Sequence, residues 1–180
     1  MLFLKLLFIM DRDKIHKTFY TTTFFLGLFL CTLQVDIYRK TVVPMSNIFG
    51  VLFPVSVATF LCIKNDYRDT YQRKSLFFPV MQSIASFGLI GCHIFMASNL
   101  YFAHNDIFIK SCLISSRHTI GTKNPQPAIE IDYEGTEKQL VFYRGQEDEV
   151  DKSSYVLLTV RKGFWGYDVF DDIKLTNQAN

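Results

Sequence analysis

The chain of 180 residues lacks the features by which most enzymes are identified from sequence. It has no glycine-rich loop of the kind that holds phosphate groups and no spaced Cys and His pairs that would bind zinc. None of its histidines outside the apolar stretches stands in a nucleophile or Cys/His signature. We therefore expect a protein that is not an enzyme and that holds no metal, no cofactor and no nucleotide.

Cysteine is scarce where a disulfide would matter most. Cys31, Cys62 and Cys92 lie in long apolar stretches, which leaves Cys112 alone in the C-terminal part of the chain. No disulfide can form within that part, so it must be stabilised by its own hydrophobic core. The chain also lacks an Asn-X-Ser/Thr glycosylation acceptor, which favours a bacterial cell envelope over a eukaryotic surface.

Charge is absent from three stretches, residues 18–35, 42–63 and 76–100. Each approaches the ~20 apolar residues that a helix needs to cross ~30 Å of hydrocarbon, and none shows the charged stripe of a soluble bundle. We predict three transmembrane helices within residues 18–100. Residues 1–17 form a cytoplasmic or interfacial segment; its first ten residues are too short to span the membrane, and the chain could equally start at Met10.

Basic residues flank these stretches unevenly. Eight lie on one side (Lys5, Arg12, Lys14, Lys17, Lys64, Arg68, Arg73 and Lys74) and four on the other (Arg39, Lys40, Lys110 and Arg117). Because basic loops stay in the cytoplasm, the bias predicts a multi-pass inner-membrane protein with its N-terminus inside and its C-terminal domain outside. Basic residues that border spans do not form a nucleic-acid-binding face, so we expect no nucleic-acid partner.

Polar groups inside the stretches are few. His93 is the only titratable candidate for a proton path, which disfavours an ion-coupled pump, and we expect it to be hydrogen-bonded or near the headgroups. Small residues at helical spacing allow close approach of helices, and they serve either an internal bundle, which we favour, or a partner protein. The predicted helix-packing residues are Gly27, Gly50, Ala58, Ala85 and Gly88.

Residues 101–180 change to a period of two, which is typical of strands. Alternating segments at 106–119, 129–133, 138–144, 155–162 and 167–175 predict a small antiparallel β domain of about five strands, as a sheet, sandwich or open barrel. The most apolar segment, 155–162, should lie centrally. A turn is expected at Glu134 and Gly135, a solvated acidic loop at 146–152, and a bulge at Asp171 and Asp172.

The segment 162–167 contains the chain's single tryptophan between two glycines. One hypothesis tucks Trp165 under the sheet as part of the core; the other exposes it as an anchor for a partner or for the membrane interface. We favour the first, because a small domain without disulfides needs every large apolar group. The candidate interaction residues are Phe164, Trp165 and Tyr167.

These features favour a non-enzymatic integral membrane protein whose periplasmic β domain binds another protein, as an accessory or assembly subunit of a bacterial envelope complex. The expected partners are the lipid bilayer and a protein in the membrane or periplasm. An immunity protein against a toxin is the alternative, and a toxin gene beside this one would favour it. A membrane-bound enzyme is disfavoured by the lack of a catalytic constellation.

Overall fold

The computed structural model describes residues 2–72 and 74–178, with side chains described from Asp13 onward. These residues form two compact units. The first contains the helices up to Val35 and from Met45 to Phe95; the second contains Asp36–Pro44 and the chain from Met96 onward. The choice between an interfacial N-terminal segment and a start at Met10 concerns side chains that lie outside this description.

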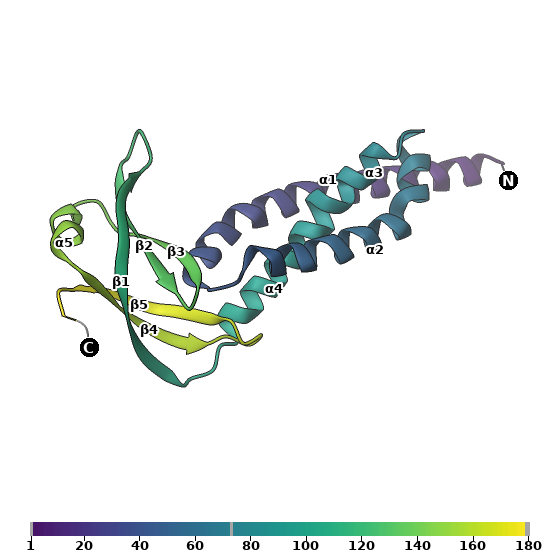
Figure 1. Ribbon diagram of the computed structural model, residues 1–180. Coiled ribbons are helices and arrows are strands. Elements are labelled where there is room, and N and C mark those ends of the chain that lie inside the picture. The colour runs from purple at the N-terminus through teal and green to yellow at the C-terminus, as the bar shows by residue number, and fades with distance from the viewer. Residues whose placement is uncertain (1, 73, 179–180) are drawn as a thin grey trace. The chain divides into compact units, whose positions relative to one another are not determined.

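Three helical runs confirm the three predicted apolar helices (Figure 1). They are α1 (Leu2–Lys40), α2 (Met45–Tyr71) and a third run made of α3 (Phe77–Gln82), the π-helical segment η1 (Ser83–Gly88) and α4 (Leu89–Tyr101). By length and composition, Asp13–Lys40, Met45–Tyr71 and Phe77–Tyr101 could each cross a membrane. The second helix begins at Met45 rather than at 42, because Pro44 disfavours helical geometry in the residue before it.

Gln82 ties the third run to the first helix. Its side chain is buried, and Nε2 donates to the Tyr20 carbonyl at 2.8 Å and to Ser86 Oγ at 2.7 Å. A buried amide without partners would cost several kcal/mol, so the bond to the Tyr20 carbonyl favours one register of the third run against the first helix. Directly after Gln82 the α-helix changes to the π-helical segment η1. Short π-helical segments inside α-helices frequently occur at functional sites.

The five predicted antiparallel strands form one sheet in the order β3-β2-β1-β4-β5 (Figure 1). They are β1 (Ile107–Ile120), β2 (Gln126–Tyr133), β3 (Thr136–Val141), β4 (Tyr155–Lys162) and β5 (Asp168–Thr176). The first half of β1 pairs with β4 and its second half with β2. One long strand therefore joins the β2–β3 hairpin to the β4–β5 hairpin.

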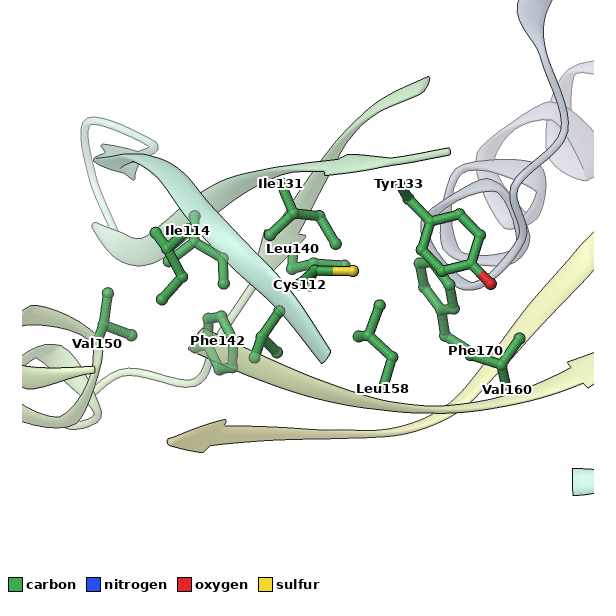
Figure 2. Packing of buried hydrophobic residues seen from close by; sticks show 12 residues of the cluster. Cys112, Ile114, Ile131, Tyr133, Leu140, Phe142, Val150, Leu158, Val160 and Phe170 are labelled. Atoms are coloured by element: carbon green, nitrogen blue, oxygen red, sulfur yellow. The ribbon is translucent and has the colours of Figure 1, made fainter. Parts of the chain in front are cut away.

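The core of the second unit lies on one face of these strands (Figure 2). Alternate residues of β4, namely Val156, Leu158 and Val160, are fully buried, as the period of two predicts. They pack with Cys112 and Ile114 of β1 and with residues of β2, β3 and β5. Figure 2 shows Tyr133 beside Phe170, and their ring centroids are 5.1 Å apart.

The turn and bulge predictions are confirmed. Glu134 and Gly135 join β2 to β3 with φ of 53° and 79°, the conformation that a two-residue hairpin turn of this type requires. The pairing of β4 with β5 shifts by one residue at Asp171, which places the bulge where two adjacent acidic residues interrupt the apolar alternation.

Two predictions about the sheet are wrong. The most apolar segment is β4, but the central strand is β1, because only β1 is long enough to pair with both hairpins. The acidic segment 146–152 contains a short helix, α5 (Glu147–Lys152), rather than a loop. The carboxylates in its first turn stabilise the helix by interacting with the positive end of the helix dipole, and Val150 is buried in the core.

Candidate functional site

Asn99 organises the turn between β4 and β5. This residue lies in the last turns of α4 and is fully buried. Its Oδ1 accepts from the Trp165 backbone N–H at 3.0 Å, its Nδ2 donates to the Tyr167 carbonyl at 3.1 Å, and its carbonyl accepts from Phe164 N–H at 3.2 Å. One side chain thus fixes a turn that lies 66 positions later in the chain.

Two glycines give the turn its shape for different reasons. A Cβ atom on Gly163 would lie 2.4 Å from the Asn99 side chain, so only glycine allows this approach. Gly166 has φ of +87°, which most side chains disfavour. Gly163 N–H donates to the Tyr167 carbonyl at 2.9 Å and closes the turn. The Gly-Phe-Trp-Gly sequence therefore folds as a tight hairpin loop.

Trp165 is not part of the core, and the hypothesis favoured from sequence is wrong. The side chain is 53% exposed, and the core cluster contains no residue of the turn. The indole Nε1 donates to Ser98 Oγ at 2.8 Å, so the ring lies against the end of α4 rather than under the sheet. Phe164 is equally exposed and Tyr167 is half-buried. The turn presents two large aromatic side chains on the surface of the second unit.

Asp168, directly after this turn, is the hub of a buried polar network. Its carboxylate accepts from the Tyr133 hydroxyl at 2.8 Å and lies 2.6 Å from Lys162 Nζ. Its carbonyl accepts from Val42 N–H at 2.8 Å. Burial, followed by the hydrogen bond to Asp168, raises the pKa of Tyr133, and the same carboxylate raises the pKa of Lys162. This network joins the segment after α1 to the sheet.

Lys138 makes a second connection, to the last turn of α1. It occupies a β3 position that faces the core, and it is buried. Its Nζ donates to the Tyr38 carbonyl at 2.9 Å and lies 3.9 Å from the Tyr38 ring centroid. Burial lowers the pKa of Lys138 to about 8. The signal in the sequence is a lysine at an inward position of an alternating strand, on the same face as Leu140.

The first half of β1 exposes an apolar surface. Ile107, Ile109 and Leu113 point away from the core, and Ile109 is 68% exposed. Among the described residues, the pairing with β2 begins only at Ile114, so the backbone of residues 107–111 has a ladder partner on one side alone. The sequence shows apolar residues on both faces of this strand, and a single hydrophobic core can cover only one of the two faces. We call residues 107–113 the open strand.

The predicted helix-packing residues fall into two groups. A Cβ atom on Gly27 would lie 2.1 Å from the Ala85 carbonyl oxygen, and one on Gly88 would lie 2.4 Å from Ser56 Oγ. The structure thus brings Gly27 to Ala85, and Gly88 to the second helix. Gly50 and Ala58 lie on exposed parts of α2, and no atom lies within 4 Å of a Cβ built on Gly50.

The remaining polar residues form local contacts, such as those of His16 and Tyr20 with the Asp66 carboxylate at 3.0 and 2.6 Å. No group of three or more His, Cys, Asp or Glu side chains able to hold a metal occurs within residues 2–72 and 74–178 whose side chains are described. His118 pairs with Gln139 at 2.6 Å, and Cys112 lies in the core, where burial raises its pKa. His93 is half-buried in α4, and its Nδ1 has no hydrogen-bond partner among the described residues.

Comparisons with protein families, with curated proteins and with solved structures find no match for this chain. What can be said of its function therefore rests on its own residues.

Proposed function

We propose that this chain is a non-enzymatic protein of the bacterial inner membrane whose β domain, on the periplasmic side, binds another protein. In this role it is an accessory or assembly subunit of an envelope complex. The single observation that carries the proposal is the open strand, where Ile107, Ile109 and Leu113 are exposed beside a backbone edge that is paired on one side only.

An edge of this kind favours binding of an extended segment of another protein. Unpaired main-chain groups form hydrogen bonds to an added strand, and alternate side chains give specificity. Proteins usually block such edges with charge, proline or a bulge. The single charged residue of the open strand is Lys110, and its ammonium lies over the Tyr133 ring at 4.4 Å and pairs with Glu134. Lys110 lies on the opposite face of the strand from Ile107, Ile109 and Leu113, so the face that these three residues share carries only Ser111 besides them.

The anchored position of the sheet also fits a subunit that receives a partner. Lys138 and Asp168 bind Tyr38, in the last turn of α1, and Val42, just after it, to two different strands, so the end of α1 and the chain after α4 belong to one unit. A partner bound to the open strand would then be held by a domain that is connected to the spans at more than one point.

Photocrosslinking from the open strand tests the proposal. A photoreactive amino acid at Ile109 in the full-length protein, activated in intact cells, should give one discrete adduct with a different polypeptide. Glu137 of β3 is the matched control, because it is exposed on another strand of the same sheet and should give none. Mass spectrometry of the adduct identifies the partner, and a toxin at this position would favour the immunity role instead.

Ile109→Asp provides the second arm of this experiment. A charge on the exposed face should abolish copurification of the crosslinked protein, whereas Glu137→Ala should leave it intact. Absence of an adduct at position 109, or an adduct with copies of this chain alone, would contradict the proposal.

A further inference from the structure

Three aromatic side chains, Phe102, Phe164 and Trp165, contact one another in series where α4 ends. Tyr101, the last residue of α4, precedes Phe102 in the chain and is 75% exposed. Phe164 and Trp165 reach the same place from the β4–β5 turn. The Phe102 and Phe164 ring centroids are 6.2 Å apart, and those of Phe164 and Trp165 are 4.9 Å apart. We call these four residues the aromatic collar.

The position of the collar along the chain is informative. Phe77–Tyr101 is apolar enough to cross a membrane, and Tyr101 is its last residue. Asn99 and Ser98, one turn earlier, bind the backbone and the indole N–H of Trp165. The β4–β5 turn is therefore fixed to the end of an apolar span, which is the level where hydrocarbon gives way to headgroups.

The chemistry of the collar suits that level. Trp and Tyr are enriched at membrane–water interfaces, because their rings are apolar and their N–H or O–H groups remain hydrogen-bonded. Trp165 meets both conditions, since Ser98 Oγ accepts its indole N–H while about half of the side chain stays exposed.

Basic residues occur in the same unit as the collar. Arg39 and Lys40 end α1, and Thr41 forms a bridge with Val169, two residues after Tyr167. Lys162, at the other end of the turn, is half-exposed and paired with Asp168. Cationic groups near an apolar anchor favour phospholipid headgroups, whose phosphates are anionic. A protein partner would not require this combination at the end of a span.

We propose that the aromatic collar is a lipid-binding anchor that seats the β domain at the phospholipid interface of the bilayer. The turn of residues 163–167 contributes Phe164 and Trp165. The end of α4 contributes Tyr101 and the polar side chains that hold the turn in place, and Phe102 follows directly after the helix. This inference does not depend on the protein partner proposed above, because it concerns different residues and a different ligand.

The single tryptophan provides a direct test in the unmodified full-length chain. The protein is reconstituted in phosphatidylcholine and phosphatidylglycerol vesicles that carry bromine at shallow or deep acyl positions, and Trp165 emission is compared with emission in unbrominated vesicles. Shallow bromine should remove most of the emission, deep bromine less, and aqueous iodide little. Strong quenching by iodide with none by bromine would overturn the proposal, as would protection from both quenchers, which would indicate coverage by protein.

A matched control separates the collar from the rest of the β domain. In the double variant Trp165→Phe with Tyr143→Trp, the indole moves to a side chain that is 82% exposed before α5. Iodide should quench this variant and brominated lipid should not. Equal quenching of both proteins by brominated lipid would contradict a contact confined to the collar.

Discussion

Asn99 is the residue on which the β4–β5 turn depends. In Asn99→Ala the Trp165 N–H loses its bond to Oδ1 and the Tyr167 carbonyl loses one of its two donors but keeps the Gly163 N–H, at a cost of about 0.5 to 1.5 kcal/mol for each hydrogen bond lost. We expect a lower melting temperature for the detergent-solubilised protein and a change in Trp165 emission. Asn105→Ala, at an exposed position a few residues later, is the control and should change neither. An unchanged melting temperature for Asn99→Ala would mean that the turn keeps its conformation without the Asn99 side chain.

The burial of Lys138 predicts that the free energy of unfolding depends on pH, and the direction of the pKa shift sets the sign of that dependence. Its pKa is lowered from 10.5 to about 8, so between these values the unfolded chain keeps a proton that the folded protein has released. The free energy of unfolding contributed by this residue therefore rises with pH from about 8 upward, and it is lowest below 8, where a buried ammonium must be kept.

The comparison of wild type with Lys138→Met measures this contribution. The melting temperature of the wild type, relative to the variant, should increase between pH 7 and pH 9.5. Lys123→Met, at an exposed lysine, provides the control and should keep a constant difference from wild type. A constant difference for Lys138→Met as well would show that the lysine titrates normally in the folded protein.

At the scale of elements, the first unit offers two glycines that differ only in what surrounds them. Gly27→Ala places a methyl group against the Ala85 carbonyl, and overpacking of this kind costs about 1 to 3 kcal/mol. Gly50→Ala meets no atom within 4 Å and should gain up to about 1 kcal/mol from helix propensity. Thermal unfolding in one detergent compares the two variants. Equal melting temperatures would mean that α1 does not pack on η1 through Gly27.

The elements were largely predictable because each has a local signal. Absence of charge located the three helices, a period of two located the five strands, and Gly135 located the hairpin turn. The order of the strands was not predictable from apolarity. The most apolar strand, β4, is second from the edge of the sheet. The central strand is β1, because it is long enough to pair with both hairpins.

The candidate site was less predictable because its contacts join residues far apart in the chain. The segment with Phe164 and Trp165 was found by its glycines and aromatics, but its exposure depends on Asn99, and no local pattern connects the two. The open strand was visible as apolar residues on both faces of 106–119. Only the sheet order reveals that one face stays uncovered and one edge stays unpaired.

At the scale of the whole molecule, the composition of the second unit constrains the membrane topology. Residues 36–44 contain the end of α1 and the link to α2, and the chain from Met96 onward lies far from them in sequence, yet the two segments form one compact unit. If each of the three apolar helices crosses the membrane, these two segments lie on the same side of it, whereas two or four crossings would separate the sheet from residues 36–44. The contacts of Thr41 with Val169 and of Lys138 with Tyr38 require the same side.

The most direct test of this account is the side of the membrane on which each segment lies. Alkaline phosphatase, which is active only outside the cytoplasm, is fused after Asn180 and, in a second protein, after Lys74 in a bacterial host. We predict high activity for the fusion after Asn180 and low activity for the fusion after Lys74, since the two points are separated by one span and the basic residues keep the second loop inside. Equal activity of the two fusions, or activity after Lys74 alone, would contradict the three-span topology with an outer β domain.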